Sequence, residues 1–211
     1  MLERLTLEDL IANANAYDRY RSRLVRGNPD GWPSSGFQRA NFEQLVKIEG
    51  VSGVSLVGSR CLDVGCGTGE MAPYLEERGV RSYEGIDVRK DAVLLARKKY
   101  PFSFFHIQDL LTKSKDERFD FIFCSGAMTA RIPSGNGEYM SKMVRKMWAL
   151  ARVGVAFNYL VPGRVTEDDY CHLFSRGDVL EVLASLRPSV RGFSLAHEEG
   201  QQQDTIIVTK V

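Results

Sequence analysis

The stretch CLDVGCGTGEMAPYL, residues 61–75, places three glycines between an apolar run and a helical pattern. Glycine adopts backbone conformations with positive φ and allows a ligand to come close to the main chain. A loop this short and this rich in glycine therefore predicts a ligand that lies against the backbone.

Around this loop, short apolar runs alternate with helical stretches, a pattern typical of a parallel sheet covered on both faces. The runs are 60–64, 82–87, 102–107, 119–125 and 153–160, and the helical stretches are 69–79, 89–100, 138–151 and 178–186. Two further runs, 189–198 and 204–211, are joined by a short polar segment, which predicts an antiparallel hairpin at one edge. The expected fold is α/β, a doubly wound, seven-stranded Rossmann-like sheet.

The first fifty residues differ from the rest and predict an N-terminal helical extension of a domain spanning 51–211. A helix is expected from Thr6 to about Arg26, then a loop over 27–38 that carries Trp32, then a helix over 41–50. Two interpretations stay open for this extension: a lid that closes over the site, or a helix packed on the sheet edge.

Composition disfavours several classes of function. The 211 residues carry 28 Lys and Arg against 27 Asp and Glu, so a net charge of +1 offers no field that would gather nucleic acid. The four cysteines lack the spacing of a zinc site, so we expect reduced thiols, no bound metal and a cytoplasmic location. The N-terminus lacks an apolar signal core, and no run is long enough to span a membrane.

The glycine loop and the residues that follow the next two strands also indicate the chemical class of the ligand. A dinucleotide fingerprint needs a small residue where this chain has Glu70, whose carboxylate would repel a pyrophosphate. Asp87 ends the second predicted strand, where a carboxylate can accept hydrogen bonds from both ribose hydroxyls. Asp109 follows the third strand and is placed to accept from an exocyclic amine. Together these features predict adenosine without phosphates.

In motif order and spacing, DVGCGTGE, YEGID, QDLL and FDFIFCS resemble the class I S-adenosylmethionine-dependent methyltransferases over residues 61–211. The resemblance implies that S-adenosylmethionine is bound and S-adenosylhomocysteine released. It implies cofactor contacts from Asp63, Gly65, Cys66, Gly67, Asp87, Val88, Asp109, Leu110, Ser125 and Arg39. Gly65 and Gly67 would face the methionine half, Asp63 would support the loop, and the Ser125 carbonyl would face the cofactor amine. Arg39 and Gln38 are the candidates for the cofactor carboxylate.

The acceptor is less well defined. Methyl transfer mainly requires the nucleophile to be held in line with the methyl group, and a general base is needed only for a hydroxyl acceptor. His172 is the candidate base, because His106 is expected to be a core histidine. Trp32, Met128 and Tyr159 are expected to line the acceptor pocket.

Residues 125–128 read Ser-Gly-Ala-Met, without the Asn/Asp-Pro-Pro-aromatic motif that family members use on amino groups of nucleic-acid bases and protein glutamine. We therefore expect methylation at oxygen or nitrogen of a small or medium-sized metabolite. The open alternatives are an RNA or protein methyltransferase and a noncatalytic cofactor-binding module, and Glu70 disfavours a nicotinamide oxidoreductase.

Overall fold

The computed structural model describes residues 15, 31–114, 116–133, 135–163, 171–198 and 202–210. The predicted helix from Thr6 to Arg26, apart from residue 15, and the start of the following loop lie outside the described residues. The same holds for 164–170, which precede His172.

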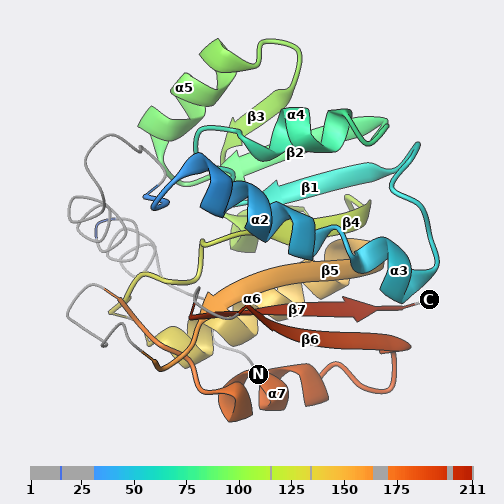
Figure 1. The fold of residues 1–211 in the computed structure, drawn as a ribbon, viewed down its shortest axis with the longest axis vertical. Helices are drawn as coiled ribbons and strands as arrows, with labels where there is room; N and C mark the ends of the chain where they lie inside the picture. The colour runs from blue at the N-terminus through green and yellow to red at the C-terminus, as the bar shows by residue number, and fades with distance from the viewer. Residues whose placement is uncertain are drawn as a thin grey trace.

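A single seven-stranded sheet forms the centre of the molecule, with the strand order β3-β2-β1-β4-β5-β7-β6 (Figure 1). The five strands β1 to β5 run parallel, and β7 is antiparallel to both β5 and β6. Their bounds are β1 Arg60–Val64, β2 Ser82–Asp87, β3 Phe104–Ile107, β4 Phe119–Cys124, β5 Ala151–Leu160, β6 Gly192–Glu198 and β7 Gln203–Thr209. The doubly wound sheet and its antiparallel hairpin edge are as predicted.

Helices cover both faces of the sheet: α2 crosses in front of it in Figure 1, whereas α6 lies behind it. The helices are α2 Ser35–Leu45, α3 Ile48–Ser52, α4 Met71–Glu76, α5 Lys90–Lys99, α6 Asn136–Leu150 and α7 Arg176–Ala184, with a 3-10 turn, η1, at Leu110–Thr112. In one buried cluster, α2, α3, α4 and α5 pack on one face of the sheet. In a second cluster, α6 and α7 pack on the other face. Met140, Met143 and Met147 belong to the second cluster, because residues three and four positions apart share one face of α6.

Two local expectations were wrong. The expected loop over 27–38 ends earlier, because the Ser34 side chain caps α2 by accepting a 3.1 Å hydrogen bond from the backbone N–H of Phe37. His106 is exposed rather than in the core, because β3 is the edge strand and buries only Phe105 of its four residues.

Candidate functional site

The glycine loop follows β1 and is tied to the end of β2. The backbone N–H groups of Gly65 and Cys66 both donate to the carbonyl of Ile86, at 2.8 and 3.1 Å. Gly65 has a φ of +73°, and a Cβ there would lie 2.3 Å from the Cβ of Ala127. Both its conformation and its surroundings therefore require glycine. At Gly65 the loop therefore brings main chain, without a side chain, next to Ala127 in the segment that follows β4.

Asp87 holds this loop from the end of β2. Its Oδ2 accepts from the backbone N–H of Gly67 and its Oδ1 from that of Arg89, each at 2.8 Å. The side chain is only 7% exposed, so these bonds fix a buried carboxylate in one orientation. A fixed acceptor at this strand end can bind hydroxyl groups of a ligand.

A cavity lies at the carboxyl ends of β1, β2 and β3 and encloses about 420 Å³, including space open to solvent. It is lined by Val64, Gly65, Ile86, Asp87, Val88, Gln108, Asp109, Leu110, Ala127, Tyr139 and Met143. Of the residues predicted to contact the cofactor, the structure brings Gly65, Asp87, Val88, Asp109 and Leu110 to this one space. Ligands of open parallel sheets bind at this edge, because the loops diverge there.

Asp109 combines a structural contact with a place in the cavity wall. Its Oδ1 accepts a 2.7 Å hydrogen bond from the backbone N–H of Leu111 and so caps η1. Burial raises the pKa of this carboxyl above its ordinary value of 3.8, and the Leu111 bond opposes that shift only in part. Tyr139 faces the same region from α6, and burial, with Asp109 nearby, raises its pKa. Its hydroxyl therefore keeps its proton and can donate.

Tyr139 and Met143 were not predicted to line the site. They lie four residues apart on α6 and therefore share one face of that helix. Their spacing was a usable signal, but the sequence could not show that this face meets the cavity. Gln108 also lines the cavity and was not predicted to do so, although it is the first residue of the QDLL motif and directly precedes Asp109.

The remaining predicted cofactor residues lie next to the cavity or apart from it. Asp63 is buried and accepts a hydrogen bond from Tyr83, and Cys66 packs in the core on the α4 side. The hydroxyl of Ser125 accepts from the side chain of Asn158 at 3.3 Å. Arg39 does not line the cavity: it is half exposed on α2, 3.8 Å from Glu43.

The predicted acceptor residues are dispersed. The ring of Trp32 lies against Gly126, where a Cβ would come within 3.0 Å of its Cζ2 atom. Met128 is buried in the core with only 2% of its surface exposed. Tyr159 is fully buried, and its hydroxyl donates to Asp204 at 3.3 Å. Met128 belongs to the loop after β4 but packs in the core, whereas Trp32 packs on that loop at Gly126.

His172 lies beside the same loop. Its backbone N–H donates to the carbonyl of Thr129 at 2.9 Å, and Cys171 forms an isolated antiparallel bridge with Ala130. The imidazole packs edge-to-face on Phe174, with ring centroids 4.5 Å apart. The segment carrying the predicted base therefore returns to the end of β4, next to the cofactor side of the sheet.

A buried amide network holds the loop after β4. Asn158, in β5, accepts from the backbone N–H of Gly126 at 2.7 Å and donates to Asn41 of α2 at 3.3 Å. Gln203, at the start of β7, donates to the same Asn41 oxygen. Asn41 and Asn158 are almost completely buried, so this network fixes α2 against the ends of β4, β5 and β7.

Two further features bear on the kind of site. Within the described residues, no helix combines the length and the apolar character needed to cross a membrane. The described side chains include no group of three or more histidines, cysteines, aspartates or glutamates placed to hold a metal ion.

Comparisons with known proteins agree with this geometry. Residues 61–152, which include the glycine loop, Asp87 and Asp109, match a family model described as "Methyltransferase domain". No curated protein matches the chain by sequence.

Solved structures share the whole architecture. Magnesium protoporphyrin IX methyltransferase (ChlM) from Synechocystis PCC 6803, with bound SAM, is 18% identical, with 99% of this chain and 100% of that chain covered at a TM-score of 0.66. The N-methyltransferase NodS from Bradyrhizobium japonicum WM9, in complex with S-adenosylhomocysteine, is 17% identical, with 92% and 97% covered and a TM-score of 0.67. CalS10, an amino pentose methyltransferase from Micromonospora echinaspora, is 16% identical, with 99% of each chain covered and a TM-score of 0.66.

Identities this low establish the shared fold alone, and the family model adds a sequence match over residues 61–152. Residues 61–152 thus match the model of a methyltransferase domain, and the chain has the fold of S-adenosylmethionine-dependent methyltransferases that its motifs predicted.

Proposed function

We propose that this domain binds S-adenosylmethionine in the cavity and transfers its methyl group to oxygen or nitrogen of a small or medium-sized metabolite. The observation that carries the proposal is the meeting of Gly65, Asp87 and Asp109, from three separate strand ends, in one cavity. The glycine backbone suits close approach of the ligand, Asp87 suits ribose hydroxyls and Asp109 suits an exocyclic amine.

The residues present fit an adenosyl ligand better than a dinucleotide. Glu70 stands at the position where a dinucleotide fingerprint needs a small residue, and its carboxylate is held by Lys99 and by a 2.8 Å hydrogen bond from Tyr100. A fixed carboxylate at the start of α4 opposes a pyrophosphate there. Gly65, by contrast, leaves the main chain bare beside Ala127.

Two observations support a small acceptor. The similar structures include proteins whose names give a magnesium protoporphyrin and an amino pentose as acceptors. The segment after β4, Ser125 to Met128, lacks the motif for exocyclic amines of nucleic-acid bases, and the net charge is +1. A substrate panel in which methyl transfer occurred only to RNA or protein would contradict this choice.

The bound cofactor would supply an electrophilic methyl group on a sulfonium. The protein's task is then to hold the acceptor in line with that methyl and to exclude water. We assign the general-base role toward a hydroxyl acceptor to His172, which lies beside the loop after β4, and the acceptor-side wall to Trp32 and that loop. A His172→Asn variant should lose turnover with a hydroxyl acceptor and keep it with an amine, which needs no base.

The direct test is thermal unfolding of the wild type and Asp87→Ala with S-adenosylhomocysteine, S-adenosylmethionine and NAD. At a hundredfold excess over the dissociation constant, a ligand stabilises by about 2.7 kcal/mol, or roughly 5 to 11 °C for a chain of this length. Only the two adenosyl compounds should shift the wild type, and Asp87→Ala should reduce that shift.

Asp120→Ala is the matched control, because Asp120 also accepts a 2.8 Å hydrogen bond from a backbone N–H, that of Arg60, but lies outside the cavity wall. Its melting temperature should fall while its ligand shift is preserved. An equal shift with NAD would overturn the proposal in favour of a dinucleotide-binding protein. No shift with any compound would overturn it in favour of the noncatalytic module.

Two further assignments are proposals. We place the protein in the cytoplasm, which Cys61 and Cys124 support, since burial raises the pKa of both thiols to about 12 and makes them inert. We also propose residues 1–50 as an N-terminal extension of the domain at 51–211. Deleting 1–30 leaves α2 in place: a stable protein without turnover would indicate a lid, and an insoluble one a structural element.

A further inference from the structure

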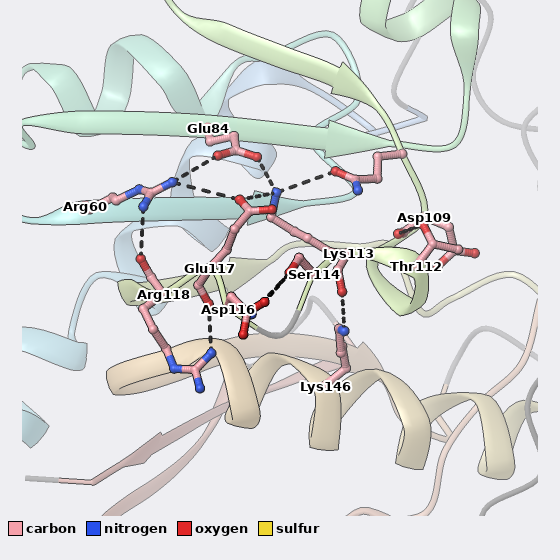
Figure 2. A network of polar contacts seen from close by, with 11 residues as sticks. Arg60, Glu84, Asp109, Thr112, Lys113, Ser114, Asp116, Glu117, Arg118 and Lys146 are labelled. Atoms are coloured by element: carbon pink, nitrogen blue, oxygen red, sulfur yellow. Dashed lines mark hydrogen bonds and ion pairs between the residues drawn. The ribbon is translucent and has the colours of Figure 1, made fainter.

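A buried lysine lies directly behind the cavity wall. The side chain of Lys113 is 2% exposed, although lysine is rarely buried unless it is paired. Its Nζ is 2.5 Å from Oε1 of Glu84 in β2 and 2.9 Å from Oε2 of Glu117, just before β4. Figure 2 shows it between these two carboxylates. The ammonium therefore joins two segments that are far apart in the sequence.

This lysine also closes the segment that supplies one wall of the cavity. Gln108, Asp109 and Leu110 line the cavity, and η1 ends one residue before Lys113. The Nζ of Lys113 lies 3.5 Å from Oε1 of Gln108, and the Lys113 backbone N–H donates to the carbonyl of Leu110 at 3.1 Å. The lysine thus contacts the cavity wall from behind, through both its side chain and its main chain.

Both ends of this segment are fixed. At the start, the backbone N–H of Gln108 donates to the carbonyl of Asp87 at 3.0 Å. At the end, the carbonyl of Lys113 accepts a hydrogen bond from Lys146 of α6, and its side chain reaches back to the sheet (Figure 2). Between β3 and β4 the described residues form no helix, only η1, so there is no longer element to hold this wall.

We propose that Lys113 is a positioning residue for the nucleoside half of the cofactor, an inference that rests on the proposed function. Its ion pairs with Glu84 and Glu117 hold the end of η1 in place. The wall residues Gln108, Asp109 and Leu110 are therefore ordered before the ligand binds. Without that anchor, binding would have to order these side chains at a cost in conformational entropy.

The test is isothermal titration of the full chain with S-adenosylhomocysteine and with 5′-methylthioadenosine, which lacks the amino acid. The variant is Lys113→Met/Glu84→Gln, which removes both charges and leaves no unpaired carboxylate on β2 to unfold the protein. Both dissociation constants should rise by about tenfold, because both ligands share the nucleoside. Lys113→Arg, which keeps the charge, should recover most of the affinity.

Arg60→Gln is the matched control. Arg60 lies 3.6 Å from Glu84 and 3.9 Å from Glu117 in the same network, and it also contacts Arg118 and the ring of Phe119, which do not line the cavity. It should alter stability while both dissociation constants stay within about twofold of the wild type. Unchanged affinity in the folded double variant, or equal weakening in Arg60→Gln, would overturn the proposal.

Hydrogen exchange of the ligand-free protein tests the same inference without the cofactor. The amides of Leu111, Thr112 and Lys113 all donate within η1, so they should exchange faster in the double variant and at the wild-type rate in Arg60→Gln. If the wild type binds neither ligand, the proposed function fails while this exchange result still decides whether Lys113 orders the turn. An unchanged exchange rate of these amides in the double variant would contradict the role of Lys113 in ordering η1.

Discussion

The hydroxyl of Tyr83 donates a 2.7 Å hydrogen bond to Oδ2 of Asp63, and both side chains are buried. The two residues lie on neighbouring strands, and Tyr83 reaches Asp63 across Gly85, where a Cβ would lie 2.9 Å from the tyrosine oxygen. Burial, with Asp63 close by, raises the pKa of Tyr83 well above its ordinary value. The tyrosine therefore remains a donor to the carboxylate near the end of the first strand.

Tyr83→Phe should destabilise the protein by about 1–3 kcal/mol, because a buried carboxylate loses a hydrogen bond that no water can replace. Urea unfolding measures this change. Tyr83→Phe/Asp63→Asn should recover part of the loss, since the amide carries no charge. A single variant within about 0.5 kcal/mol of the wild type would show that the bond adds little.

Gly65→Ala should weaken binding of S-adenosylhomocysteine by about tenfold or more and lower stability by about 1–3 kcal/mol. The new Cβ would lie 2.3 Å from that of Ala127, at a φ of +73°. Adding Ala127→Gly should relieve the overlap and leave only the backbone strain.

Gly137→Ala is the control for this pair. Gly137 lies in α6, and a Cβ added there would have no described atom within 4 Å, so alanine should be neutral or stabilise by up to about 1 kcal/mol. Titration and thermal unfolding of the three variants would contradict the explanation if Ala127→Gly rescued nothing or if Gly137→Ala weakened binding equally.

Affinity for the nucleoside should depend on pH through Asp109. Burial raises its pKa above the ordinary 3.8, and only the ionised carboxylate is a full acceptor for an exocyclic amine. Binding of 5′-methylthioadenosine should therefore weaken as the pH falls through this raised pKa. Asp109→Asn, which cannot titrate, should bind with a flatter pH profile.

Protonation of Asp109 does not itself destabilise the fold. A raised folded-state pKa means that the folded chain holds the proton more tightly than the unfolded chain, so Asp109 favours folding as the pH falls. Identical pH profiles for the wild type and Asp109→Asn would show that this carboxyl does not meet the base.

Asp204 should have the opposite effect on stability. Burial alone would raise its pKa, but hydrogen bonds from Arg176, at 2.5 and 3.0 Å, and from His197, at 2.7 Å, outweigh burial and lower it. A lowered folded-state pKa stabilises the protein above the unfolded value of about 3.9, and this contribution is lost as the pH falls through the lowered pKa.

Asp204→Asn should therefore cost about 1–3 kcal/mol at neutral pH, a moderate value because Arg176 is half exposed. Acid unfolding should also become less steep below about pH 4. Circular dichroism at a series of pH values measures both effects. An acid transition as steep as that of the wild type would mean that other carboxyls dominate it.

Much of the site was predictable because its signals are local. Gly65, Asp87 and Asp109 each lie at or just after the end of an apolar run, and in a parallel sheet such ends meet at one edge. The same local reading failed for His106, because nothing within a four-residue strand says that it lies at the sheet edge. It also failed for the start of α2, where one serine cap outweighed the loop-like composition before it.

The sequence by itself determined the alternation of strands and helices, the glycine loop and the order of the cofactor motifs, since hydrophobic period and turn chemistry act within a few residues. Only the tertiary structure decided which side chains close the site. Lys113 meets Glu84 from 29 residues away, and Asn158 meets Asn41 from 117 residues away. Tyr159 meets Asp204 from 45 residues away. Such contacts depend on strand order and register, which no local pattern encodes.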